Sequence, residues 1–206
     1  MELTYILVFL ISAGIMFLGA ISGGVGLVLR PLLIFLGFPA INVVGSVRFA
    51  AIFGEIPSIY LLHKNKKIDW KLVLFLVIPT FIGSIIASIA VISILKNSLE
   101  LIIGFVLLIV GFILLIKKNK GLEEKKYKFS KKNHLIGFIG TLVISFFNTI
   151  TGGMGPIFSS LYIANYRKSY ITASALSKTA SYIGTGIASL VFVISGVVDY
   201  KLFIAF

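Results

Sequence analysis

Long uncharged stretches dominate this chain and restrict it to one class of fold. Apolar segments of spanning length lie at about 3–20, 41–62, 70–95, 99–116, 134–150 and 171–195. A helix needs about 20 apolar residues to cross about 30 Å of hydrocarbon. Hydrophobic residues make up 58% of the chain and charged residues 13%, whereas soluble domains have about 45–50% and about 25%. The sequence therefore predicts an all-α, polytopic transmembrane helical bundle within a lipid bilayer, and we expect a multi-pass protein of a prokaryotic plasma membrane.

The net charge of +12 does not indicate nucleic-acid binding. The lysines lie in short loops between apolar spans, many of them in 117–132, where the positive-inside rule predicts them. The chain has no cysteine, which excludes disulfides and thiol ligands. His63 and His134 stand beside lysine runs at the ends of spans, a poor arrangement for a metal site. We therefore expect no nucleic-acid partner, no bound metal and no cofactor.

Two short apolar segments, 27–37 and 156–164, each follow a glycine cluster. The clusters are Gly23-Gly24-Val25-Gly26 and Gly152-Gly153-Met154-Gly155. Glycine runs interrupt a helix, and unwound backbone at membrane depth is tolerated only inside protein or along a cavity. Pro156 follows the second cluster at the first helical position, which proline prefers. Each cluster therefore predicts a broken helix, with a half-helix that restarts after the break.

An internal repeat relates the two halves of the chain. Arg48 matches Lys178, and the sequence DWKL at 69–72 matches DYKL at 199–202, all at an offset of 130. Composition alone does not explain why a basic residue and this four-residue sequence recur at the same offset. We divide the chain into a first transmembrane repeat at 1–116, a basic cytoplasmic loop at 117–132 and a second repeat at 133–206. The second repeat stops about 40 residues short of the first, so we expect a truncated sequence rather than an unusually short member.

The charges of equivalent loops favour inverted repeats. The loop after the basic helix is positive in the first half, at 63–67, and uncharged in the second, at 195–198. The loop before that helix is neutral in the first half, whereas in the second half 165–169 carries Arg167 and Lys168. Inversion places 63–67, 117–132 and 165–169 together in the cytoplasm. It requires each glycine-broken segment to be re-entrant; if 134–150 crosses the bilayer instead, the repeats are parallel.

Four charged residues lie inside apolar segments, where charge is costly and usually functional. Arg30, Arg48 and Lys178 are candidates to bind a substrate, and Glu55 is the embedded carboxylate. Arg48 and Glu55 are seven residues apart, about 10 Å along a helix, so a structural ion pair is the alternative for Arg48. Arg30 could also reach the interface from a short helix. Glu55 is either a counter-ion to Arg48 or the carrier of a coupling proton or cation.

The surroundings of these cations point to a small anion. Ser174, Ser181, Tyr182 and Thr185 share a helix stripe with Lys178, although small polar residues at this spacing also serve helix packing. The half-helices restart at Gly24 and Gly26 and at Gly153 and Gly155, and helix N-termini attract anions. Broken helices at a repeat interface hold substrate in transporters. The residues alone thus predict a secondary transporter or channel for a small anionic substrate.

The glycine clusters also resemble the two motifs of the TauE/SafE family. The first motif is recognisable in Ser22-Gly23 through Gly26, Pro31-Leu32-Leu33, Leu36-Gly37-Phe38-Pro39 and Gly45-Ser46, although its glycine run is shorter than usual. The second is recognisable in Gly153-Met154-Gly155-Pro156 with Ala173-Ser174, and the resemblance covers essentially the whole chain. It implies an exporter of sulfite, sulfoacetate or a related sulfonate or organic acid. It also adds Ser46 and Ser174 to the candidate substrate-binding residues.

Two other classes of protein compete with a carrier. An intramembrane enzyme needs paired carboxylates, a metal-ligand set or a Ser/His pair at membrane depth, and Glu55 is the one embedded carboxylate, so we expect no enzyme activity. A membrane-embedded binding or assembly factor predicts that Arg48 and Lys178 tolerate neutral replacement. An anion channel predicts flux that does not saturate. Homo-oligomerisation is compatible with each of these classes.

Overall fold

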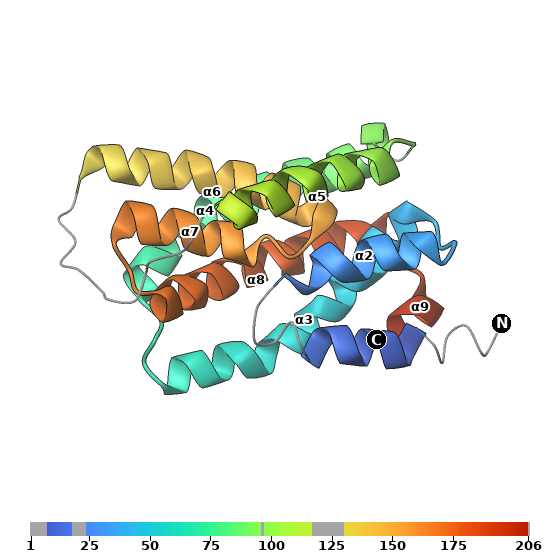
Figure 1. The fold of residues 1–206 in the computed structure, drawn as a ribbon, viewed down its shortest axis with the longest axis horizontal. Helices are drawn as coiled ribbons and strands as arrows, with labels where there is room; N and C mark the ends of the chain where they lie inside the picture. The colour runs from blue at the N-terminus through green and yellow to red at the C-terminus, as the bar shows by residue number, and fades with distance from the viewer. Residues whose placement is uncertain (1–7, 18–23, 96, 117–129, 206) are drawn as a thin grey trace.

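The computed structural model of the protein describes residues 8–17, 24–95, 97–116 and 130–205 (Figure 1). All regular structure within these ranges is helical, and four helices are long and apolar enough to cross a membrane: Ala40–Lys64, Trp70–Ile94, Lys131–Thr151 and Tyr170–Ile194. After a helix at Val8–Phe17, the elements are α2 (Val25–Phe35), α3 (Ala40–Lys64), α4 (Trp70–Ala90) with a π-helical turn η1 (Val91–Leu95), α5 (Leu99–Ile116), α6 (Lys131–Thr151), α7 (Gly155–Tyr166), α8 (Tyr170–Ile194) and α9 (Tyr200–Ile204). The predicted all-α polytopic bundle is confirmed.

The boundaries of the helices recur along the chain. α2 and α7, α3 and α8, and α4 and α9 each begin 130 residues apart, and α3 and α8 also end 130 residues apart. An aspartate caps the N-terminus of both α4 and α9. Asp69 accepts a hydrogen bond from the backbone N–H of Leu72, and Asp199 accepts one from the backbone N–H of Leu202. The register deduced from Arg48 onward therefore extends back to the first residue of each half-helix.

The paired helices run in opposite directions. In Figure 1, α2 and α7 both start near the centre and run to opposite ends of the molecule, and α3 and α8 are antiparallel. The start of α6 and the end of α7 lie next to each other at the same end of the molecule. The side-chain amide of Asn133 donates to the backbone carbonyl of Asn165, and the side-chain amide of Asn165 donates to the backbone carbonyl of Asn133. This geometry is what an inverted repeat with a re-entrant α6–α7 pair requires. Inversion stays a prediction, which these directions favour. Residues 117–129 of the loop predicted to be cytoplasmic lie outside the described residues.

α4 packs between α6 and α8 through small residues. A Cβ on Gly83 would lie 2.5 Å from the backbone oxygen of Leu142 in α6. A Cβ on Gly184 of α8 would lie 2.5 Å from Oγ of Ser84 in α4. Small residues let helix backbones approach closely, which is how membrane helices gain packing energy without a hydrophobic driving force. The helix of the first half thus lies against two helices of the second half.

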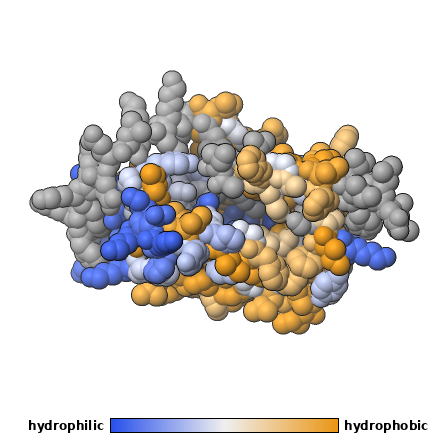
Figure 2. All heavy atoms as spheres, turned by 90° about the horizontal axis from the view of Figure 1, so that it is seen from below, coloured by the Kyte–Doolittle hydropathy of each residue, from blue (hydrophilic) through white to orange (hydrophobic). Residues whose placement is uncertain are grey.

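The surface of the bundle divides into an apolar body and a basic end. Large apolar side chains project outward from the spanning helices, including Leu74, Leu101, Leu108 and Ile194. Figure 2 shows hydrophilic residues gathered toward one end of this face, with hydrophobic residues over much of the rest. The ends of α3 and α7 and the starts of α4 and α6 meet at the basic end. This distribution is the one expected of a bundle surrounded by lipid.

The two glycine breaks meet each other inside the bundle. A Cβ on Gly26 would lie 2.8 Å from Cα of Gly152, and a Cβ on Gly153 would lie 2.8 Å from the backbone oxygen of Gly24. Gly24, Gly152 and Gly153 have φ angles of +84°, +70° and +72°, in the left-handed region that side chains disfavour. Backbone of the first half therefore touches backbone of the second half, and glycine is required for both the contact and the chain path.

We predict that Gly26→Ala lowers stability, because the new methyl meets backbone atoms that cannot rotate away. The expected loss is about 1–3 kcal/mol, the usual cost of overpacking, and it would be measured as a lower midpoint of thermal unfolding in detergent. Gly155→Ala is the matched control, since its Cβ would have its nearest neighbour, Oγ of Ser177, at 4.0 Å. Equal midpoints for the two variants would contradict a tight crossing.

Candidate functional site

A cavity of about 250 Å³ lies where the glycine breaks meet. Its walls come from the N-terminal ends of α2 and α7, the middle of α3 and α8, and the C-terminal end of α6. Most of the residues selected from the sequence line it: Gly24, Gly26, Arg30, Arg48, Glu55, Gly153, Gly155 and Lys178. Residues more than 100 positions apart in the chain are thus brought to one site.

Both arginines cap the end of α6. Nη1 of Arg30 donates to the backbone oxygens of Thr149, at 3.0 Å, and of Ile150. Nη1 of Arg48 donates to the backbone oxygen of Asn148 at 3.2 Å. The last carbonyls of a helix lack partners within the helix and carry its negative dipole end. Because the break at Gly152 stops α6 inside the bundle, these two guanidiniums supply the hydrogen bonds that water would supply at a surface.

Each arginine retains hydrogen-bonding capacity after capping α6. Their side chains are almost fully buried, at 1% exposure for Arg30 and 4% for Arg48. The Nε atoms of both are buried and have no hydrogen-bond partner among the described residues. A guanidinium carries five N–H donors, and its planar fork suits oxyanions. The arginines therefore combine a structural role at α6 with the chemistry of an anion site.

Lys178 and Glu55 both line the cavity, and no ion pair joins them within the described residues. Nζ of Lys178 on α8 donates to Oγ of Ser58 on α3 at 2.9 Å, one helical turn from Glu55. Within the described ranges, no ion pair joins Glu55 to Lys178 or Arg48. Oε2 of Glu55 is buried and has no hydrogen-bond partner there. The direct Arg48–Glu55 pair considered from the sequence is therefore absent from this structure, although the two side chains share the cavity.

The electrostatic balance of the cavity favours an anion. Three cationic side chains, those of Arg30, Arg48 and Lys178, stand against one carboxylate, that of Glu55. The positive dipole ends of α2 and α7 also open onto the cavity. The negative end of α6 lies there too, but its carbonyls are engaged by the arginines. The arrangement can hold a small anion without any further charged partner.

Ser46 and Ser174 lie away from the cavity lining. Oγ of Ser46 donates to the backbone oxygen of Asp199 at 3.1 Å and accepts from its N–H at 2.9 Å, which ties α3 to the start of α9. Ser174 is half-buried on α8 and is not among the lining residues. On α8 the lining face carries Ser177 and Ser181 beside Lys178. Of the polar stripe predicted on α8, Lys178 and Ser181 therefore line the cavity, whereas Ser174, Tyr182 and Thr185 do not.

Sequence reasoning missed three polar residues of the site. Asn148 and Ser58 line the cavity as well as Ser177. Oδ1 of Asn148 accepts a hydrogen bond from the backbone N–H of Met154 at 3.0 Å, so it spans the glycine break from within. Its position four residues before Gly152 was a usable signal, because an amide there can satisfy the backbone that the break leaves free. Ser58 gave no comparable signal, since its role depends on a lysine 120 residues away.

Comparison with known proteins agrees with this architecture. The model of the family described as sulfite exporter TauE/SafE matches residues 7–206. A protein of Haemophilus influenzae described as "Probable membrane transporter protein" is 24% identical over 187 residues, which cover 90% of this chain and 72% of the relative. No solved structure matches the chain. The family match extends over both glycine breaks and all three embedded cations, and the chain belongs to the TauE/SafE family of membrane transporters.

Proposed function

We propose that this protein is a secondary transporter that exports a small anion such as sulfite, sulfoacetate or a related sulfonate or organic acid. The observation that carries the proposal is the cavity at the crossing of the two broken helices, where Arg30, Arg48 and Lys178 face a single carboxylate. The family description, a sulfite exporter, supports the substrate class. Charged groups at membrane depth are costly and are retained where a pathway needs them.

The size and chemistry of the cavity suit a small oxyanion. Its volume of about 250 Å³ lies below the range of about 300–1,000 Å³ that is usual for drug-sized ligands. The unused guanidinium N–H groups and the Lys178 ammonium provide charge-assisted hydrogen bonds, which are roughly twice as strong as neutral ones. Ser58, Ser177 and Ser181 add hydroxyl groups that donate or accept. An organic cation would meet the same three positive charges and be repelled.

We also propose that the protein lies in a prokaryotic plasma membrane with its basic end in the cytoplasm, and the arrangement of the helices supports a carrier. Half-helices that start at the centre and run to opposite ends leave the site between two structural halves, as alternating access requires. The basic loops gather at one end, where the positive-inside rule places the cytoplasm. An anion channel and a binding or assembly factor without transport are the competing functions. Saturation of flux separates a channel from a carrier.

Lys178→Gln provides the cleanest test of the proposed anion site. Among the described residues the Lys178 ammonium donates to Ser58 and not to α6, so the substitution leaves the α6 caps intact, whereas neutral arginine variants would also uncap α6. We expect saturable sulfite flux into proteoliposomes, with an apparent affinity at least tenfold weaker in Lys178→Gln. A cation about 4 Å from an anion contributes about 4 kcal/mol at an effective dielectric near 20, and a tenfold change in affinity needs about 1.4 kcal/mol. Ser174→Ala, on the same helix and outside the cavity, should transport like the unmodified protein. No flux of sulfite, sulfoacetate or sulfonates in folded protein would favour the assembly factor.

Glu55→Gln tests the two roles proposed for the embedded carboxylate. Removing a negative charge from the cavity should strengthen anion binding by about tenfold, as expected for charges about 10 Å apart at an effective dielectric near 20. If Glu55 is a counter-ion, the dependence of sulfite flux on an imposed pH gradient is the same in the variant and in the unmodified protein. If Glu55 carries a coupling proton, the variant loses that dependence while it still binds sulfite. Weaker sulfite binding in the variant would contradict both roles.

A further inference from the structure

A second hollow lies at the basic end of the molecule, separate from the substrate cavity. It is a groove of about 790 Å³ between the first turns of α4 and α6, closed on one side by the α7–α8 loop. Lysines from all three segments line it, namely Lys71, Lys131 and Lys168. None of its lining residues lines the substrate cavity. Neither the transport proposal nor the glycine crossing accounts for this groove.

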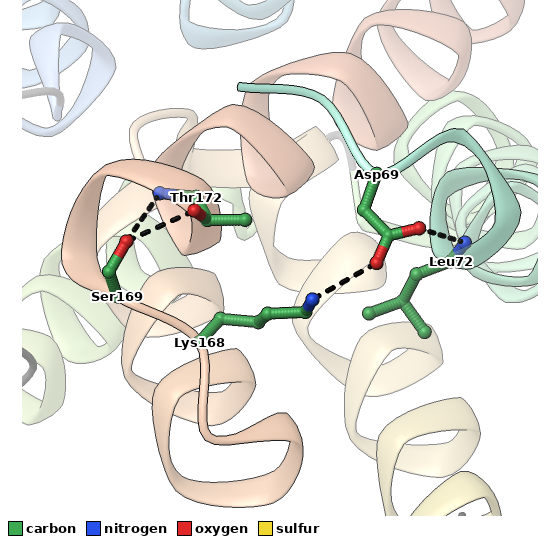
Figure 3. Close-up of polar contacts among 5 residues, drawn as sticks. All are labelled: Asp69, Leu72, Lys168, Ser169 and Thr172. Atoms are coloured by element: carbon green, nitrogen blue, oxygen red, sulfur yellow. Dashed lines mark hydrogen bonds and ion pairs between the residues drawn. The ribbon is translucent and has the colours of Figure 1, made fainter. Parts of the chain in front are cut away.

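The charged side of the groove is held in place by an ion pair. Nζ of Lys168 lies 3.1 Å from Oδ2 of Asp69, and the other oxygen of Asp69 accepts from the N–H of Leu72 (Figure 3). Ser169 fixes the adjoining loop, because its Oγ accepts from the N–H of Thr172 at the start of α8. Asp69 therefore neutralises one lysine and anchors it at the groove. Lys71 and Lys131 are exposed and remain to attract an anion.

The opposite side of the groove is apolar and continues into the lipid-facing surface. Phe75, Leu135 and Phe138 line it, and Leu135 is 61% exposed. Beyond the groove, Leu74 on α4 is 69% exposed and belongs to the apolar body of the bundle. A free inorganic anion would make no use of this wall. A ligand with an anionic group and a hydrocarbon chain would use both sides.

We propose that this groove binds an anionic phospholipid. The headgroup phosphate lies among Lys71, Lys131 and Lys168, and an acyl chain runs along Phe75, Leu135 and Phe138. Basic pockets between transmembrane helices on the cytoplasmic side bind headgroups of this kind, and each lysine near an anionic surface contributes about 1 kcal/mol. The bound lipid would join α4 of the first repeat to α6 and the α7–α8 loop of the second. It would thereby stabilise the basic end of the bundle whether or not the protein transports sulfite.

The test compares the stabilising effect of two lipids that share acyl chains. Thermal unfolding of the full chain in detergent is followed while phosphatidylglycerol or phosphatidylcholine is added. We expect phosphatidylglycerol to raise the midpoint and phosphatidylcholine to have little effect. In Lys71→Gln/Lys131→Gln the apparent affinity for phosphatidylglycerol should fall by about 25-fold, as two lysines at the surface imply. Lys64→Gln/Lys66→Gln is the matched control, because it removes the same charge at the same end without touching the groove lining.

Four results would overturn the proposal. An equal loss in the control variant would show general attraction of the basic end to anionic surfaces. Equal stabilisation by soluble glycerophosphoglycerol, which has the headgroup and no chains, would show a site for a small anion. Equal response to the two lipids, or a midpoint that follows dimer formation by a second copy of the chain, would show that the groove does not select an anionic lipid.

Discussion

The structure depends on a backbone contact at membrane depth between two interrupted helices. Gly26 meets Gly152, and Gly153 meets Gly24, at distances that leave no room for a Cβ on Gly26 or on Gly153. Interrupting a helix in this setting leaves carbonyls at the end of α6 short of backbone donors, although that of Asn148 still accepts from the N–H of Gly152. In lipid no water can supply the missing hydrogen bonds. Arg30 and Arg48 come from the other half of the chain and donate to those carbonyls. The glycine breaks and the buried arginines therefore depend on each other, because the arginines supply hydrogen-bond donors to the helix end that the break creates.

The glycine breaks and the arginines that cap α6 also form the proposed substrate site. Capping α6 uses some of the donors of each guanidinium, and both arginines line a cavity that also receives two positive helix ends. Lys178 differs from the arginines because its contact is with a serine hydroxyl on α3. A neutral residue at Lys178 removes charge from the cavity, whereas a neutral residue at Arg30 or Arg48 also removes a helix cap. Loss of transport in arginine variants thus has two physical causes, which the lysine variant separates.

The two ends of the bundle have different chemistry although the helix boundaries repeat at one offset. At the basic end, Asp69 pairs with Lys168 across the two halves. At the equivalent position of the other end, Phe38 replaces Lys168, and Asp199 is tied through its backbone to Ser46. Within the described residues, the repeated backbone thus carries an ionic contact at the basic end and none at the equivalent position of the other end. This difference is what gives the basic end a groove suited to an anionic lipid.

The sequence by itself determined the spans, the two breaks, the offset of the repeat and the embedded cations, because each follows from local composition or from self-similarity along the chain. It could not determine the exact rotation of α8 about its axis, so it selected Ser174 beside Lys178 and Ser181, whereas the structure places Ser177 beside them at the cavity. It also assigned Ser46 to the site, whereas the fold uses Ser46 to hold α9. The role of the arginines as caps of α6 depends on partners 100 to 120 residues away. Tertiary structure decided these points, since helix rotation and long-range hydrogen bonds are set by packing between the two halves and not by the periodicity of either one.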